Sequence, residues 1–389
     1  MNNKHVLELD GVRGIACLSI LLSHCLLGLI VTDKGSIARD ILQGTTALLL
    51  GGVPLFFVLS GFLIGGILLD TRGKDHYFKA FWVRRIARIF PVCYFLVATY
   101  GIALFIAAHF NLNQMNIWVL AEPRPPILSY LTFTQSFWLA ANGYGGPGWL
   151  GITWSLAIEE QFYLLFPLAV YFMSHRAVII LAVGSILLTP LFRIIADQIY
   201  PDWYGAYVLL PCRADNLMCG VLVAIIVRNP RALSIAIRYR ALLDVAIVVM
   251  AASIATDDIL FRLVPAHNFS YSVIACMFGL LVLRIFLYRR GRYNAFLRAP
   301  ILAKFGLISY ALYMYHQSIN GTVHAFFFNS APHIETWRQF AAAIGVMVTA
   351  IALATTSYFV LERPIRRYGH RLSTSFSKTE PGPLVSNAA

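Results

Sequence analysis

Two ionisable residues, Arg13 and His24, lie inside one apolar stretch of the sequence, residues 10–27. Their separation of eleven positions corresponds in an α-helix to about three turns plus roughly 20° of rotation and about 16 Å of rise, so both side chains project from one face. A histidine near the middle of a bilayer is costly unless it faces protein or water. His24 is therefore a candidate for proton transfer or nucleophilic chemistry. The alternative is a structural histidine that bonds a neighbouring helix.

A cluster of arginines follows in the segment WVRRIARIFP, residues 82–91. Arg85 and Arg88 are three positions apart and Arg84 and Arg88 are four, so one helical turn presents all three on neighbouring faces. Because arginine binds phosphate through paired N–H groups, the cluster is suited to a phosphorylated donor. The alternative is an anchor that snorkels to lipid phosphates.

Ser155, Glu159 and Tyr163 recur at every fourth position of the segment WSLAIEEQFY. They share one stripe of a helix, whereas Glu160 points about 100° away. Two adjacent carboxylates inside an apolar run are hard to explain by packing, because a buried glutamate needs either a proton or a cation. The pattern therefore favours a functional role for this segment.

Two later segments supply further polar groups within apolar runs. Arg213 and Asp215 stand at the start of one run and are candidate partners of the buried glutamates. In the segment ISYALYMYH, Ser309, Tyr313 and His316 share one helix face. We interpret Tyr313 and His316 as supporting residues, because tyrosine and histidine in membrane helices commonly bond a neighbouring helix.

Membrane helices are the elements that position these residues. Apolar residues make up 59% of the 389 residues, charged residues make up 13%, and the mean hydropathy is +0.69, which excludes an ordinary soluble protein. The net charge of +13 is explained by retention of lysine and arginine on the cytoplasmic side and indicates no nucleic-acid partner. The six cysteines lie within or beside apolar runs without a CxxC pattern, so no metal site is predicted.

Ten hydrophobic segments predict an all-α membrane protein with a single ten-helix bundle over residues 1–370. An even number of crossings places both termini on one side of the membrane. Loops on that side carry 22 lysines and arginines against 5 on the other, which predicts that both termini are cytoplasmic. The predicted spans are approximately residues 10–31, 46–69, 85–109, 152–173, 177–195, 207–227, 241–257, 268–288, 304–327 and 339–361.

The connections and the carboxyl-terminal tail carry weaker signals. Residues 110–151 form a long outer loop with turn residues at both ends, as is typical of a lid or binding loop. Its apolar centre, residues 127–141, is a candidate re-entrant helix. Residues 371–389 are rich in Ser, Thr, Pro and Gly, and we expect them to be disordered. In the second span, Gly61 and Gly65 form a small-residue face that favours close helix packing.

Seven segments together resemble the acyltransferase-3 family of integral membrane acyltransferases, in that family's order over residues 8–367. The resemblance implies transfer of an acyl group, most often acetyl from acetyl-CoA, to a hydroxyl of a carbohydrate. It also implies a ten-helix bundle in the cytoplasmic (inner) membrane and an acceptor such as an exopolysaccharide, a lipopolysaccharide or an oligosaccharide. The segments are LDGVRGIACLSILLSH, PLFFVLSGFLI, RRIARIFP, WSLAIEEQFYLLFP, PCRADNLMCGVLVA, ISYALYMYH and YFVLERPIRR.

The resemblance also implies roles for individual residues. The family's R-x10-H pair falls on Arg13 and His24, with the histidine essential for catalysis. The family's RxxR motif falls on Arg85 and Arg88, which are implicated in donor binding, and its acidic segment falls on residues 159–160. Some members carry a fused periplasmic esterase-like domain, whereas this chain resembles the stand-alone form.

The resulting hypothesis has acetyl-CoA entering from the cytoplasm, its phosphates near the arginine cluster and its pantetheine arm reaching His24. The histidine acts as general base on the acceptor hydroxyl or accepts the acyl group itself, and Glu159 orients the acceptor or relays its proton. A rival from another class is a proton-coupled transporter or flippase that uses His24, Glu159 and His316 as proton sites. A second rival keeps the enzyme but changes the acceptor to a lipid or a small secondary metabolite.

Overall fold

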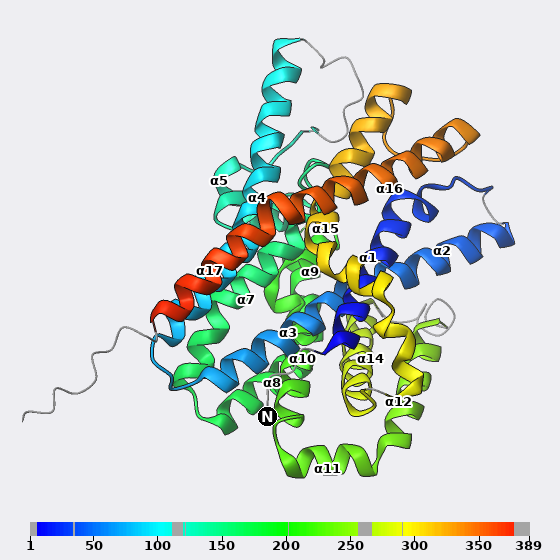
Figure 1. Ribbon diagram of the computed structural model, residues 1–389. Helices are drawn as coiled ribbons and strands as arrows, with labels where there is room; N and C mark the ends of the chain where they lie inside the picture. Colours follow the sequence, from blue (N-terminus) through cyan, green and yellow to red (C-terminus); the bar gives the residue numbers. More distant parts are fainter. Residues whose placement is uncertain are drawn as a thin grey trace, which may run out of the picture.

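The computed structural model of the chain is a bundle of helices (Figure 1). It describes residues 6–33, 36–110, 120, 122–200, 202–255, 267–289 and 291–376. No β-strand occurs among these residues, and a single isolated bridge joins Ile30 to Ile334. The helical class predicted from the sequence is therefore confirmed for the described residues.

The described helices are spread over both halves of the chain. The amino-terminal half contains α1 (Leu7–Cys25), η1 (Leu27–Leu29), α2 (Ile37–Leu50), α3 (Gly52–Thr71), α4 (Tyr77–His109), α5 (Ile127–Leu131), α6 (Gln135–Asn142), α7 (Thr153–Phe172) and α8 (His175–Ile199). The carboxyl-terminal half contains α9 (Tyr204–Val208), η4 (Leu210–Cys212), α10 (Ala214–Ile226), α11 (Pro230–Arg238), α12 (Arg240–Ala255), α14 (His267–Leu287), η5 (Arg292–Arg298), α15 (Pro300–Phe328), α16 (Trp337–Ser357), η6 (Tyr358–Glu362) and α17 (Arg363–Ser375).

Side-chain caps fix where several of these helices begin. The hydroxyl of Ser36 accepts a hydrogen bond from a backbone N–H in the first turn of α2, and that of Ser174 does the same for α8. Helix α16 starts with a capping box, in which Thr336 and Gln339 each bond the other's backbone N–H. Such caps satisfy donors that have no partner within the helix, so they define the helix starts.

Helices α1, α3, α10 and α15 pack closely at the centre of the bundle, and small residues permit their approach. A Cβ atom added to Gly61 of α3 would lie 1.9 Å from the backbone oxygen of Leu217 in α10. A Cβ added to Gly306 of α15 would lie 2.2 Å from the backbone oxygen of Asp10 in α1. The close packing predicted at Gly61 is therefore confirmed, and α3 is held against α10 at backbone distance.

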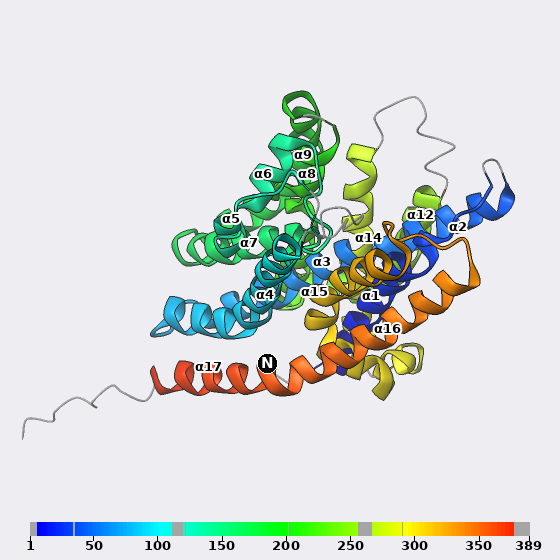
Figure 2. The same ribbon diagram turned by 90° about the horizontal axis from the view of Figure 1, so that it is seen from above.

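Helices α16, η6 and α17 continue one another along one side of the bundle (Figure 2). Helix α17 packs against α4, where Gly369 faces Ala87. It runs to Ser375, so residues 371–375 of the expected disordered tail are helical. Residues 377–389 of that tail lie outside the described residues.

Six of the described helical segments are long and apolar enough to cross a membrane, or seven if the bent pair α10 and α11, at 101°, is one span. A helix is present at each of the ten predicted positions. Helices α7 and α15 carry polar groups such as Glu159, Glu160 and His316, which lower their mean hydropathy. The number of ten crossings and the cytoplasmic placement of both termini stay predictions.

The described part of the outer loop contains two short helices in place of a single re-entrant one. Helix α5 has 5 residues and α6 has 8, and between them Phe133 adopts a left-handed conformation with φ of 56°. Neither helix is long enough to cross a bilayer. Helix α6 packs against α7 and α9, so the segment covers the bundle beside the outer start of α7.

Candidate functional site

A cavity of about 870 Å³ opens between α1, α3, α4, α7, α10, α14 and α15. Its mouth is the end where α3, α10 and α14 terminate, because the exposed residues Arg72 and Arg289 line it there. The predicted site residues that line it are Arg13, Arg85, Arg88, Ser155, Glu159, Tyr163 and Tyr313. The fold therefore brings together, in one space, segments that are far apart in the sequence.

A chain of hydrogen bonds runs along one wall of the cavity. The hydroxyl of Tyr163 donates to Glu159 Oε2 at 2.9 Å and lies 2.5 Å from the hydroxyl of Ser60. The indole N–H of Trp82 donates to the backbone oxygen of Tyr163 at 3.2 Å. These bonds join α3, α4 and α7, so the carboxylate of Glu159 is held in a defined position.

The guanidinium groups of Arg13, Arg85 and Arg88 lie near that carboxylate, although none of them is within ion-pair distance of it among the described residues. Glu159 interacts electrostatically with all three, and Arg13 Nη1 also lies 3.8 Å from Asp10 Oδ1. Because Glu160 also interacts with Arg85, the three guanidinium groups are balanced by three carboxylates, those of Asp10, Glu159 and Glu160. The buried Nε of Arg85 has no hydrogen-bond partner among the described residues. This unpaired guanidinium donor is available to an anionic ligand.

Glu160 departs from this arrangement, as its position on the helix predicts. It does not line the cavity, and its buried Oε1 has no hydrogen-bond partner among the described residues. Its nearest charged neighbours are Glu159 and Arg85. The two adjacent glutamates therefore differ in their surroundings, and only Glu159 faces the cavity.

His24 forms a pair with His316, the second histidine within the predicted spans. Nδ1 of His24 lies 2.9 Å from Nε2 of His316, and the two rings meet edge to edge, with centroids 5.2 Å apart and an interplanar angle of 7°. His24 comes from the last turn of α1 and His316 from the middle of α15. His316 is 1% exposed, whereas His24 is partly exposed.

Hydrogen-bond partners define which ring nitrogen carries the proton in each histidine. Nδ1 of His316 lies 2.7 Å from the backbone oxygen of Tyr313 and 3.2 Å from that of Leu312. Carbonyl oxygens only accept, so this nitrogen is the donor, and in a neutral ring Nε2 is then an acceptor. His24 must donate from Nδ1, which leaves the lone pair on its Nε2. That lone pair is what a general base or a nucleophile requires.

Tyr313 connects the cavity with the histidine pair. His24 and His316 are not among the residues that line the cavity, whereas Tyr313 lines it and packs its ring against His316 at 5.8 Å between centroids. The hydroxyl of Tyr313 lies 2.7 Å from that of Ser155 and donates to the backbone oxygen of Ile152 at 3.2 Å. The Tyr313 side chain therefore occupies the inner end of the cavity.

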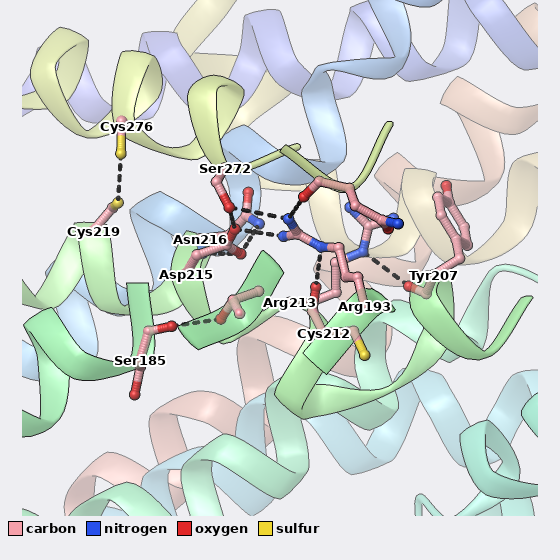
Figure 3. Close-up of polar contacts among 12 residues, drawn as sticks. Ser185, Arg193, Tyr207, Cys212, Arg213, Asp215, Asn216, Cys219, Ser272 and Cys276 are labelled. Carbon is pink, nitrogen blue, oxygen red and sulfur yellow. Dashed lines mark hydrogen bonds and ion pairs between the residues drawn. The ribbon is translucent and has the colours of Figure 1, made fainter. Parts of the chain in front are cut away.

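The expected partnership of Arg213 and Asp215 with the glutamates is wrong. Asp215 forms a fully buried ion pair with Arg193 of α8, and its Oδ2 also accepts from Ser272 at 2.6 Å (Figure 3). Arg213 donates to the backbone oxygen of Tyr207 at 2.9 Å. The carboxylates of α7 already face the arginines of α1 and α4, so Asp215 is left to neutralise Arg193.

Sequence reasoning missed Arg193 and Ser60. Arg193 is 0% exposed and donates to the backbone oxygens of Cys212 and Asn268 at 2.8 and 2.6 Å, so it joins α8 to η4 and α14. An arginine inside an apolar span is itself a signal, since such a charge requires a partner. Ser60 gave no such signal, because a single serine is common in membrane helices.

The described residues also bear on metal binding. No group of three or more histidine, cysteine, aspartate or glutamate side chains among them is arranged to hold a metal ion. The cysteines are all free, and the nearest approach, between Cys219 and Cys276, is 3.9 Å between sulfur atoms (Figure 3).

Comparison with known proteins gives a family match over most of the chain. The model of the Acyl_transf_3 family, described as an acyltransferase domain, matches residues 6–357. The O-acetyltransferase OatA of Staphylococcus aureus (strain NCTC 8325 / PS 47) is 25% identical over 377 residues, which cover 93% of this chain and 57% of OatA. The chain thus spans somewhat more than half the length of this relative. No solved structure gives a significant match.

A second relative matches a shorter region more closely. YrhL of Bacillus subtilis (strain 168), named as a candidate peptidoglycan O-acetyltransferase, is 31% identical over 188 residues. The match covers 45% of this chain and 26% of YrhL.

Proposed function

Because the chain belongs to the Acyl_transf_3 family of acyltransferase domains, we propose that it is a multi-pass membrane O-acyltransferase. It moves an acyl group, acetyl in the first instance, from acyl-CoA to a hydroxyl of a cell-surface or exported carbohydrate. The observation that carries the proposal is a series of contacts that leads from an arginine-lined cavity through Tyr313 and His316 to His24, whose Nε2 bears a lone pair. The names of OatA and YrhL support acetyl as the group and a polysaccharide as the acceptor.

Acyl-CoA enters this site as a substrate from the cavity mouth, which the charge distribution of the loops assigns to the cytoplasm. Arg13, Arg85 and Arg88 hold phosphate oxygens through charge-assisted hydrogen bonds. Glu159, whose charge acts on all three guanidinium groups, offsets part of their mutual repulsion. This differs from the expected contact of Glu159 with the acceptor, because its carboxylate lies among the groups that bind the donor.

His24 performs the chemical step with the lone pair of Nε2. As the acceptor oxygen attacks the thioester carbonyl carbon, Nε2 takes the hydroxyl proton, the C–S bond breaks, and the proton passes to the thiolate of CoA. In the alternative order, Nε2 attacks the carbonyl carbon, the C–S bond breaks and CoA leaves as the thiolate; the acceptor oxygen then attacks the acyl-imidazole, Nε2 regains its lone pair, and the hydroxyl proton passes to the thiolate. Both routes use the same nitrogen.

Tyr313 has to rotate before the thioester can meet His24. Its side chain lines the inner end of the cavity and rests against His316. Rotation breaks the hydrogen bonds of its hydroxyl to Ser155 and to the backbone oxygen of Ile152. Each such bond contributes about 0.5–1.5 kcal/mol net, so the movement is accessible at ordinary temperature.

The test is acetyl transfer in membranes supplied with isotopically labelled acetyl-CoA, for the wild-type chain and for His24→Ala. We expect label in surface polysaccharide, detected by mass spectrometry, and a loss of at least about 100-fold in the variant at an equal protein level, as for removal of a general base. Activity of His24→Ala near the wild-type value would remove His24 from the mechanism. Accumulation of solute in proteoliposomes that contain no acyl donor would instead support transport.

A further inference from the structure

The mouth of the cavity carries a second set of guanidinium groups, separate from the three that lie near Glu159. Arg72, Arg228 and Arg289 line the cavity where α3, α10 and α14 end. A second hollow of about 460 Å³ lies beside it, shares Arg228 with the cavity and adds Arg231. The mouth group, which we define as Arg72, Arg228, Arg231 and Arg289, therefore borders two adjacent hollows.

Arg228 is the fixed member of the mouth group. Its Nε and Nη2 donate to the two carboxylate oxygens of Asp70 at 2.8 and 2.7 Å, and its Nη1 donates to the backbone oxygen of Ala224 at 3.0 Å. The guanidinium lies across Gly66, where an added Cβ would come within 2.6 Å of Nη2. This clamp neutralises Arg228 and holds α3 and α10 together at the rim.

The other three arginines of the mouth group are not neutralised by a carboxylate among the described residues. Arg72 donates to the neutral backbone oxygen of Met173 at 2.6 Å, and Arg289 packs over the ring of Phe286 at 4.9 Å. Among the described residues, none of Arg72, Arg231 and Arg289 has a carboxylate within ion-pair distance. The mouth thus presents three uncompensated charges to its interior.

The two basic sets stand at different depths of the same cavity. Ser60, whose hydroxyl contacts Tyr163 beside the inner arginines, precedes Asp70 on α3 by ten residues. Ten residues of helix measure about 15 Å between backbone positions, a separation that long arginine side chains reaching in from both levels shorten. A ligand that fills the cavity therefore meets one group of arginines near its middle and another at its outer end.

We propose that the mouth group is a second anion subsite, which binds the phosphate on the ribose of the acyl-CoA donor. This inference rests on the proposed function. The donor bears a diphosphate next to its pantetheine arm and a separate phosphate on its ribose, so it carries negative charge at two places along its length. The inner arginines bind the diphosphate, and the mouth group binds the ribose phosphate and thereby distinguishes CoA from shorter thioesters.

The position of the mouth group favours a nucleotide over a lipid head group. Arginines that anchor a helix to lipid lie on its outer face, whereas these line a hollow between helices. Phe286 lines the cavity beside Arg289, and its ring offers apolar surface for the adenine base. A lipid occupant would make binding insensitive to the ribose phosphate.

The experiment measures the dissociation constants of CoA, 3′-dephospho-CoA and pantetheine for the full chain in nanodiscs of phosphatidylcholine. For the wild type we expect CoA to bind about tenfold or more tightly than 3′-dephospho-CoA, which corresponds to about 1.4 kcal/mol. In Arg231→Gln/Arg289→Gln the ratio should fall to about 1. The matched control Arg367→Gln, at an exposed position of α17 outside both hollows, should keep the wild-type ratio.

The outcomes separate this inference from the proposed function. Equal binding of CoA and 3′-dephospho-CoA by the wild type would overturn the mouth subsite and leave the donor class intact. Failure of CoA to bind at all would overturn the donor assignment and the subsite together. Arg85→Gln should weaken both nucleotides by a similar factor without changing their ratio, because it acts at the diphosphate.

Discussion

His316 fixes the proton of His24 on Nδ1, and replacing His316 tests whether this proton position matters for activity. In His316→Phe the ring volume is retained, but Nδ1–H of His24 loses the acceptor that lies 2.9 Å away. His24 can then place its proton on either nitrogen, and the ring is free to turn. A neutral hydrogen bond of this kind contributes about 0.5–1.5 kcal/mol, which corresponds to a rate loss of up to about tenfold.

The assay compares kcat and KM for acetyl-CoA in membranes that contain the wild type, His316→Phe and His316→Gln. We expect kcat to fall about tenfold in His316→Phe while KM changes by less than twofold, because His316 does not line the cavity that holds the donor. His316→Gln should recover most of kcat, since its side-chain oxygen can accept from Nδ1 of His24. Thermal unfolding midpoints of the variants control for loss of structure.

Two results would contradict this argument. Full activity of His316→Phe would show that the tautomer of His24 is set by another group. A loss of activity that follows the thermal unfolding midpoint, and that glutamine fails to rescue, would show that His316 serves packing alone.

Three further changes test other parts of the structure. Tyr313→Phe removes the hydroxyl that is bonded to Ser155. We therefore expect hydrolysis of acetyl-CoA in the absence of an acceptor, measured as thiol release, to rise several-fold. An unchanged rate would mean that the hydrogen bonds of Tyr313 do not keep the inner end of the cavity closed. Gly61→Ala should lower the free energy of unfolding by about 1–3 kcal/mol and reduce the thermal midpoint, whereas Gly184→Ala, whose Cβ meets nothing within 4 Å, should not. Arg193→Met leaves Asp215 buried without its partner and should lower the free energy of unfolding by about 3–5 kcal/mol. The double variant Arg193→Met/Asp215→Asn should regain part of that loss. A double variant as unstable as the single one would refute the ion-pair account.

The sequence alone determined which helices carry polar and ionisable groups among apolar residues and on which face of each helix these groups lie. Arg13 and His24 on one helix, Glu159 and Tyr163 on another, and Tyr313 and His316 on a third follow from the helical repeat and from the cost of placing polar groups among apolar residues. The close packing at Gly61 follows from the spacing of small residues. These inferences are local, because each depends only on residues within a few turns of one another.

Only the tertiary structure decided which polar groups meet. The bond between His24 and His316 joins residues 292 positions apart, and Asp215 pairs with Arg193 where the sequence pointed to the glutamates. Helical periodicity fixes the direction of a side chain within its helix, but it contains no information about the helix that lies opposite. In a membrane most helix surfaces are apolar, so hydrophobicity does not determine which helix packs against which. Backbone approach at small residues such as Gly61 and Gly306, together with the need to neutralise each buried charge, selects one arrangement.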